Sequence, residues 1–268
     1  MSAAQREMAS GKLVLDEPRP RVTRIAIRHR AKHGMLDQEI LDVLAATVPT
    51  LTAECLIITG DGPYFSAGYD IETLHLPAPS GAADGLTGHP SNAALQAIER
   101  YPYPVLAALN GHTFGGGLEL AMACDMRVAA GTATFAMTPG KLGIVYSHTG
   151  LRRFLDVCGL ANTNELFFLA SPIGAGHARE MGLLNRVVVA GDFEASILSI
   201  AEQIAATAPL ALAGHKRAIR TLRAELARLP EEVVEELIEL SVAGVGSADF
   251  AEGQRAFAEK RQPTWTGM

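Results

Sequence analysis

Glycine-rich segments follow two apolar runs of this chain, and they restrict its backbone more than any other feature of the sequence. The first is residues 65–71, after the run that ends at Thr59, and the second is residues 110–119, after the run that ends at Leu109. Glycine lets a backbone approach a ligand closely, and the first turn of a helix has N–H groups without an acceptor in the helix. Two such turns facing each other would point two N–H donors at a negative oxygen, as an oxyanion hole does. Each turn alone is equally typical of a helix packed closely on a sheet.

Composition excludes several classes of protein. The 268 residues are 48% apolar, enough for one large globular domain, and the net charge of −6 argues against nucleic-acid or anionic-membrane partners. Three widely spaced cysteines, Cys55, Cys124 and Cys158, match neither a disulfide framework nor a paired zinc-ligand pattern. No apolar run of signal-peptide or membrane-spanning length is present. The sequence therefore predicts a cytoplasmic protein with no nucleic-acid or membrane partner.

Strand-like and helix-like runs alternate over the first part of the chain, which favours an α/β architecture. The strand-like runs are residues 12–15, 22–27, 56–59, 104–109, 126–130, 134–137 and 186–189. Helical patterns begin after Asp37, a plausible N-cap, and cover residues 91–100 and 115–123. After Gly150 the patterns are mostly helical, with segments 151–158 and 163–169 read as separate helices. We expect a β/α core over residues 1–190, a helical C-terminal region over 191–268, and a mobile loop over 75–91.

The two glycine segments together resemble the crotonase family, the enoyl-CoA hydratase/isomerase superfamily. Their sequences are Phe-Ser-Ala-Gly-x-Asp-Ile and Asn-Gly-x-x-x-Gly-Gly-Gly-x-Glu-Leu-Ala. Further matches lie at residues 124–129, 170–173, 182–188 and 252–261, so the resemblance covers almost the whole chain. It implies the crotonase fold, an α/β spiral of β-β-α turns with a helical trimerisation region at the C-terminus.

The resemblance also implies an acyl-CoA thioester as substrate, in fatty acid metabolism, with coenzyme A as part of the substrate and no separate cofactor. Backbone N–H groups of Tyr69 and Gly116 match the oxyanion-hole positions of the family. The positions matched to substrate and CoA binding are Ala67, Gly68, Asp70, Ile71, Leu142, Phe257 and Lys260. Of these, Phe257 and Lys260 match residues that serve the CoA site of a neighbouring subunit in a trimer or hexamer. Lys260 is equally well explained as a solvated helix end, whereas Asp70 is better explained as a helix cap than as a catalytic residue.

The acid–base groups depart from the hydratase pattern. Glu119 lies three residues beyond Gly116, on the same helix face, where hydratases of the family have a glutamate. A second glutamate works with it in those enzymes, and alignment on Lys-Leu-Gly at 141–143 puts Pro139 in its place. Proline cannot transfer a proton, so hydration by two glutamates is in doubt.

Residues 137–139 and 142–146 are similar to the methylmalonyl-CoA decarboxylase branch of the family. That branch has a tyrosine matching Tyr146 and a histidine where this chain has Tyr69. Loss of carbon dioxide forms the enolate without a strong base, so the reaction needs an oxyanion hole and groups that orient a carboxylate. The hydroxyls that could do so are those of Tyr69, Tyr146, Thr138 and Ser147, although Tyr146 could instead be a core residue with a satisfied hydroxyl.

Three functions stay open at this stage. A lyase that decarboxylates a malonyl-type CoA is favoured, an enoyl-CoA hydratase or isomerase using Glu119 alone is the alternative, and a non-catalytic acyl-CoA-binding or scaffold protein is the third. Other polar residues are more simply explained by structural roles. His112 is interpreted as a hydrogen-bonded loop histidine, and His148 as a minor candidate for a proton donor. Arg152 and Arg153 are interpreted as helix-surface arginines, with binding of a phosphate or a substrate carboxylate as the alternative. No His-Glu-x-x-His or Cys-x-x-Cys motif is present, so we expect no metal.

Overall fold

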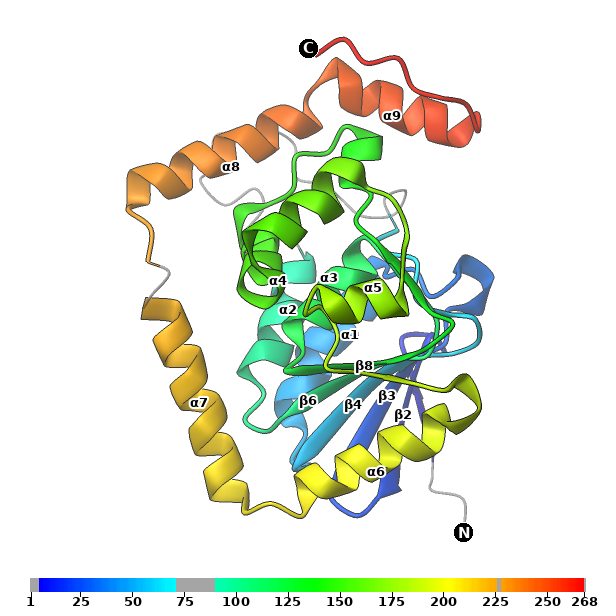
Figure 1. Ribbon diagram of the computed structural model, residues 1–268, viewed down its shortest axis with the longest axis vertical. Helices are drawn as coiled ribbons and strands as arrows, with labels where there is room; N and C mark the ends of the chain where they lie inside the picture. Colours follow the sequence, from blue (N-terminus) through cyan, green and yellow to red (C-terminus); the bar gives the residue numbers. More distant parts are fainter. Residues whose placement is uncertain (1–4, 71–89, 226–227, 268) are drawn as a thin grey trace.

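A seven-stranded sheet forms the base of the molecule in the computed structural model, which describes residues 5–70, 90–225 and 228–267 (Figure 1). Its order is β1-β2-β3-β4-β6-β8-β11. The strands are β1 (Arg6–Met8), β2 (Leu13–Arg19), β3 (Val22–Ile27), β4 (Cys55–Gly60), β6 (Val105–Leu109), β8 (Met126–Ala130) and β11 (Arg186–Val188). Pairing is antiparallel from β1 to β3 and parallel from β3 to β11. The parallel part carries the strands that lead into the two glycine segments.

A second, smaller sheet lies beyond the ends of the parallel strands. Its order is β10-β9-β7-β5, with β10 (Ile173–Gly174), β9 (Thr134–Ala136), β7 (His112–Phe114) and β5 (Tyr64–Ser66). Each of β5, β7 and β9 follows a long strand of the large sheet, so that β6, β7 and the helix α3 (Gly116–Ala123) make one strand-strand-helix unit. The expected spiral of β-β-α turns is therefore confirmed.

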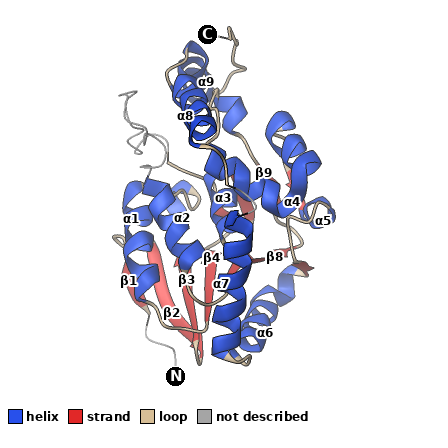
Figure 2. Cartoon of the chain, turned by 90° about the vertical axis from the view of Figure 1, so that its left-hand side faces the viewer, coloured by secondary structure: helices blue, strands red, loops and turns tan. Residues whose placement is uncertain are grey.

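Helices cover both faces of the large sheet, because its central strands are apolar on both sides. On β4, Leu56 and Ile58 face a core shared with α1 (Gln38–Thr47) and α2 (Pro90–Arg100). The alternate residues Cys55 and Ile57 face a second core with α6 (Phe193–Ala205). Figure 2 shows the sheet between these helices, with α3 near the end of the strands.

Three helices, α7 (Pro209–Glu225), α8 (Glu231–Val245) and α9 (Ala248–Ala258), extend around the core, and we call them the C-terminal arm (Figure 1). The arm is tied to the core by Lys216 of α7, whose Nζ lies 2.6 Å from Asp125 Oδ2. The helix α4 (His148–Leu169) contacts both α3 and α8, while α5 (Ala175–Glu180) contacts β9, β10 and β11. Two short 3₁₀ helices, η1 (Arg30–Lys32) and η2 (Val48–Thr50), flank α1, while η3 (Pro139–Leu142) and η4 (Ala190–Asp192) precede α4 and α6.

Several local predictions meet a clear outcome. Asp37 caps α1, since its side chain accepts the N–H of Ile40, as expected. The two helices expected over 151–158 and 163–169 are confirmed: both lie within α4, where the non-helical backbone of Gly159 (φ 73°, ψ 175°) separates them by a kink. Most of the loop expected over 75–91 lies outside the described residues, but α2 begins at Pro90. The short strands β1, β5, β7 and β10 were not expected, and His112 lies in β7 rather than in a turn.

In the described part of the chain, no single helix is long and apolar enough to cross a membrane. The segments Ala190–Ala205 and Pro209–Glu225, which are bent by 97° relative to each other, reach the length and apolar composition of a membrane span only when they are taken together.

Candidate active site

The two glycine segments are in contact in the folded chain. A Cβ built on Gly68 would lie 3.3 Å from the N of Gly116 and 3.1 Å from the carbonyl oxygen of Phe114. A Cβ on Gly116 would lie 2.4 Å from Cδ2 of Tyr69, so any larger residue at position 116 would displace the Tyr69 ring. The turns expected to face each other therefore do so.

Backbone polarity at this junction suits an anion. Gly116 is the first residue of α3 and Gly115 its N-cap, so the Gly116 N–H has no acceptor within the helix and lies at its positive end. Tyr69 forms a bridge with Leu36, in which the Leu36 N–H donates to Gly68 and the Asp70 N–H donates to Leu36. The bridge fixes the peptide groups on either side of Tyr69.

Glu119 lies one turn into α3, and only 4% of its surface is exposed. Its Oε2 accepts hydrogen bonds from Tyr69 Oη at 2.8 Å and from Tyr146 Oη at 2.6 Å. Its Oε1 accepts from Arg153 Nη1 at 3.0 Å. Two phenols and a guanidinium thus converge on one buried carboxylate. The three-residue spacing had predicted that this carboxylate shares a face of α3 with Gly116.

Arg153 corrects the expectation of a helix-surface arginine. Its side chain is buried and its Nε donates to Glu99 Oε1 at 2.8 Å, on the side away from Glu119. Burial alone would lower the pKa of Arg153, but the negative charges of Glu119 and Glu99 raise it above its ordinary value. The neighbouring Arg152 faces the C-terminal arm instead: it pairs with Asp156 at 3.0 Å and donates to the carbonyl oxygen of Arg223 of α7 at 3.4 Å.

Tyr146 is held immediately before α4. Its ring fills the space where a Cβ of Gly150 would be, 2.5 Å from Cε1, and its centroid lies 5.4 Å from that of Phe167. Burial, and secondly the charge of Glu119, raise the pKa of Tyr146 well above its ordinary value, so the phenol keeps its proton at neutral pH. The tyrosine is therefore both packed and directed at the site.

The other hydroxyls predicted for the site have different surroundings. Ser147 caps α4 by accepting the N–H of Gly150 at 3.1 Å, which commits its oxygen to the helix. Thr138 Oγ1 would lie 3.9 Å from a Cβ on Gly115, beside the glycine turn. Pro139 is buried at the start of η3, and its carbonyl oxygen accepts the N–H of Ile144 at 3.0 Å. No side-chain acid stands at that position.

The residues predicted to bind substrate lie in two places. Ala67 and Asp70 flank the first turn, where the Ala67 N–H donates to His33 and buried Asp70 pairs with Lys32 at 2.6 Å. Ile71, and any helix that Asp70 could cap, fall outside the described residues. Of the remaining positions, Leu142 lies in η3, Phe257 lies in α9 and is 67% exposed, and Lys260 follows α9.

Glu119 with Tyr69, Tyr146 and Arg153 forms a group that we call the Glu119 cluster, and the candidate histidines lie outside it. His112 Nδ1 lies 2.8 Å from Thr134 Oγ1 in the small sheet, and His148 begins α4, where burial lowers its pKa. Among the residues that the structure describes, no group of three or more His, Cys, Asp or Glu side chains could hold a metal ion.

Comparison with known proteins bears on both fold and site. A model of the enoyl-CoA hydratase/isomerase family matches residues 20–268. Methylmalonyl-CoA decarboxylase of Escherichia coli K12 is 33% identical over 253 residues, covering 92% of this chain and 95% of the relative. Carnitinyl-CoA dehydratase of the same strain is 38% identical over 217 residues, covering 79% and 80%. A structure of methylmalonyl-CoA decarboxylase with 2-nitronate-propionyl-CoA superposes with a TM-score of 0.88 at 30% identity, over 96% of this chain and 99% of the other.

Proposed function

This chain belongs to the enoyl-CoA hydratase/isomerase family and has the crotonase fold, and on that premise we propose that it decarboxylates a malonyl-type acyl-CoA thioester. The observation that carries the proposal is the convergence of two phenol hydroxyls on Glu119 Oε2. In a hydratase this carboxylate must address a water molecule, whereas here both lone pairs of one oxygen are already used. The absence of an acid at Pro139 supports the same choice.

The carbon–carbon bond to the substrate carboxylate breaks, carbon dioxide leaves, and the electron pair moves onto the thioester as an enolate. We assign the N–H groups of Tyr69 and Gly116 to the enolate oxygen. The position of Gly116 at the start of α3 supports this role, because the peptide dipoles of the helix add to its N–H. One such donor is typically worth about 3 kcal/mol of barrier.

Tyr146 and Tyr69 supply the remaining steps. A carboxylate only accepts, so in the free protein both hydroxyl hydrogens point at Glu119. A hydroxyl hydrogen can turn about the Cζ–Oη bond toward a substrate carboxylate without moving a heavy atom. One tyrosine then passes its proton to the α-carbon of the enolate, and the phenolate is reprotonated from solvent. The other tyrosine and Arg153 keep Glu119 hydrogen-bonded meanwhile.

Hydration or dehydration is the second candidate, and two observations favour it. Carnitinyl-CoA dehydratase is a relative of higher identity over a shorter span, and Glu119 stands where hydratases have an acid–base glutamate. Among the described residues, the hydrogen bond that Glu119 Oε1 accepts comes from Arg153, so one lone pair of this oxygen could address water. A non-catalytic acyl-CoA-binding protein is the third candidate, motivated by Pro139.

The proposal extends to ligand and assembly. Coenzyme A would be part of the substrate rather than a cofactor, and the chain would act in the cytoplasm as a trimer or a dimer of trimers. Phe257 and Lys260 would then serve the CoA site of a neighbouring subunit. Their exposure on and just after α9 supports this assignment, because neither is enclosed by its own chain.

The test offers the purified protein methylmalonyl-CoA, crotonyl-CoA and carnitinyl-CoA. Release of carbon dioxide and change in the conjugated-thioester absorbance are followed separately. We expect carbon dioxide from the malonyl-type thioester, and a large loss in Gly116→Pro, which removes a donor N–H and also displaces the Tyr69 ring. Turnover of crotonyl-CoA or carnitinyl-CoA without carbon dioxide would replace the proposal by the second candidate. Absence of any turnover, with CoA bound in calorimetry, would favour the third.

A further inference from the structure

Arg153 lies between two carboxylates at the back of the site. Glu119 of α3 is on one side at 3.0 Å, and Glu99 of α2 is on the other at 2.8 Å. The guanidinium is 6% exposed, as is the Glu119 side chain, while Glu99 is 26% exposed. One cation therefore neutralises one of two acids, and it links α2, α3 and α4 at the level of the tyrosine hydroxyls.

We propose that Arg153 is a positioning residue that holds Glu119 as a carboxylate and thereby directs the hydroxyl hydrogens of Tyr69 and Tyr146. The mechanistic meaning of this role rests on the proposed decarboxylation, but the charge of Glu119 can be measured without substrate. Glu99 holds the guanidinium from its far side.

The physical reason is the cost of a buried charge. A carboxylate removed from water without a cation is strongly destabilised and usually takes up a proton. A neutral carboxyl group accepts hydrogen bonds more weakly than a carboxylate and adds a donor of its own. The two phenols would then share a weaker acceptor, which would direct their hydrogens less strongly.

The geometry of the guanidinium suits this task. Arginine presents donors along a rigid planar fork, so Nε on Glu99 fixes the direction of Nη1 toward Glu119. Within residues 5–70, 90–225 and 228–267, the charged and titratable groups that face Glu119 are Tyr69, Tyr146 and Arg153. They come from the first turn, the segment before α4, and α4 itself. Since Arg153 is already bonded on both sides, we expect it to act through Glu119 and not by binding the substrate carboxylate.

A double-mutant cycle tests the proposal in the reaction. Arg153→Met should lower kcat by about 10- to 100-fold with little change in KM. In the Glu119→Gln background, where residue 119 carries no charge, the same substitution should change kcat by less than about threefold. Arg153→Lys, which keeps the charge but not the fork, should fall between the two. An equal loss in both backgrounds would overturn the proposal, because Arg153 would then act independently of Glu119.

A substrate-free measurement separates this proposal from the proposed function. In protein labelled with ¹³C at the glutamate carboxyl carbons, Glu119→Gln identifies the Glu119 signal. We expect this signal to move to its protonated position at higher pH in Arg153→Met than in the unmodified protein. Arg152→Met is the matched control, because the neighbouring Arg152 is bonded to Asp156 and to the carbonyl of Arg223 rather than to Glu119, and it should leave the Glu119 signal unchanged. Far-UV circular dichroism reports whether each variant is folded.

Coincident titrations in Arg153→Met and the unmodified protein would overturn the positioning role. If instead the titrations differ but no thioester releases carbon dioxide, the proposed decarboxylation fails while the positioning role stands. If carbon dioxide is released and the titrations coincide, the proposed decarboxylation stands and the positioning role of Arg153 fails.

Discussion

The Glu119 cluster buries polar side chains, whereas the C-terminal arm exposes apolar ones. In the cluster, three charged or phenolic groups surround one buried carboxylate. On the arm, large apolar side chains face outward: Leu210 is 90% exposed, Ile219 65% and Leu222 66%. Buried polar groups that are all hydrogen-bonded specify one arrangement, whereas exposed apolar patches mark surfaces that another molecule covers. The polar groups around Glu119 are thus hydrogen-bonded to one another within one chain, whereas the arm leaves large apolar side chains exposed on it.

The sharpest way to break this contrast is to remove one hydroxyl from the cluster. Tyr146→Phe keeps the ring against Gly150 and Phe167 but deletes a donor to Glu119. We expect kcat for carbon dioxide release to fall by about 100-fold or more, as for loss of an acid–base group. Tyr103→Phe, which removes a hydroxyl away from Glu119, is the control. A kcat unchanged in Tyr146→Phe would mean that the cluster is structural only.

The arm is tested by making its apolar surface charged. Ile219 and Leu222 lie three residues apart on one face of α7, and replacing both by Glu should reduce a trimer or hexamer to smaller species. Light scattering after gel filtration measures the mass, and Thr221→Glu adds a charge to the same helix as a control. A mass equal to that of the unmodified protein would show that another surface makes the assembly, if there is one.

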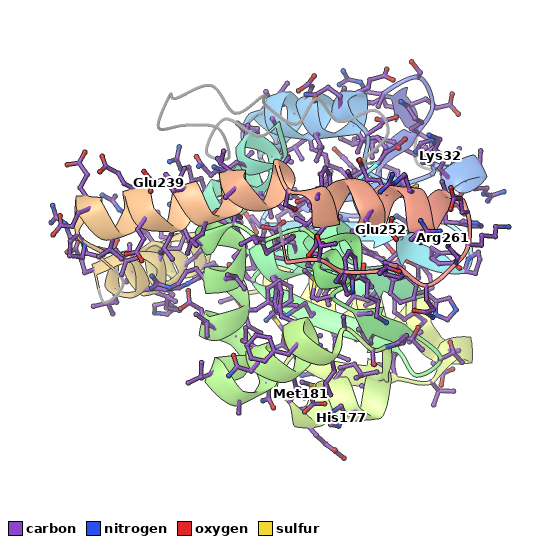
Figure 3. All side chains as sticks on the ribbon, turned by 90° about the horizontal axis from the view of Figure 1, so that it is seen from above. Lys32, His177, Met181, Glu239, Glu252 and Arg261 are labelled. Atoms are coloured by element: carbon purple, nitrogen blue, oxygen red, sulfur yellow. The ribbon has the colours of Figure 1, made fainter. Side chains whose placement is uncertain are left out.

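The smallest expected effect concerns a polar contact of the arm itself. Glu252 Oε1 accepts from Arg261 Nη1 at 2.6 Å and from the Thr264 N–H at 2.9 Å, and these contacts fold the C-terminal tail onto α9 (Figure 3). Arg261, and next the Thr264 N–H, lower the pKa of Glu252 from 4.5 to about 2. Because the folded pKa is the lower one, this contribution to stability is full above pH 4.5 and is lost as the pH falls toward 2.

Trp265 follows Thr264 and is the one tryptophan of the chain, so its fluorescence reports release of the tail. We expect a spectral change between pH 4.5 and about 2, ahead of any loss of far-UV ellipticity. In Glu252→Gln the change in Trp265 fluorescence should be absent over this pH range, except for the part caused by protonation of Asp249, which accepts the N–H of Thr266. Superimposable curves for the two proteins would show that Glu252 does not hold the tail.

The sequence indicated some of these features and could not indicate others. The three-residue step from Gly116 to Glu119 puts both on one helix face, and this local rule suffices to predict their common direction. Arg152 and Arg153 are neighbours about 100° apart around α4, so which one points inward depends on how the helix is rotated against α3. Tyr69 and Glu119 are 50 residues apart, and only the tertiary pairing of the short strands brings them together. Those strands, β5 and β7, have three residues each, too few to show a period of two.

The contact of Gly150 with its neighbours also limits the order in which this site can change over generations. A Cβ at position 150 would lie 2.5 Å from Cε1 of Tyr146 and 2.9 Å from Oε1 of Glu119. Any mutation that adds a side chain there is excluded for as long as the tyrosine ring stays in place. A descendant with a side chain at position 150 must therefore first lose the aromatic ring at position 146, and a library that varies position 150 alone will return mostly inactive clones.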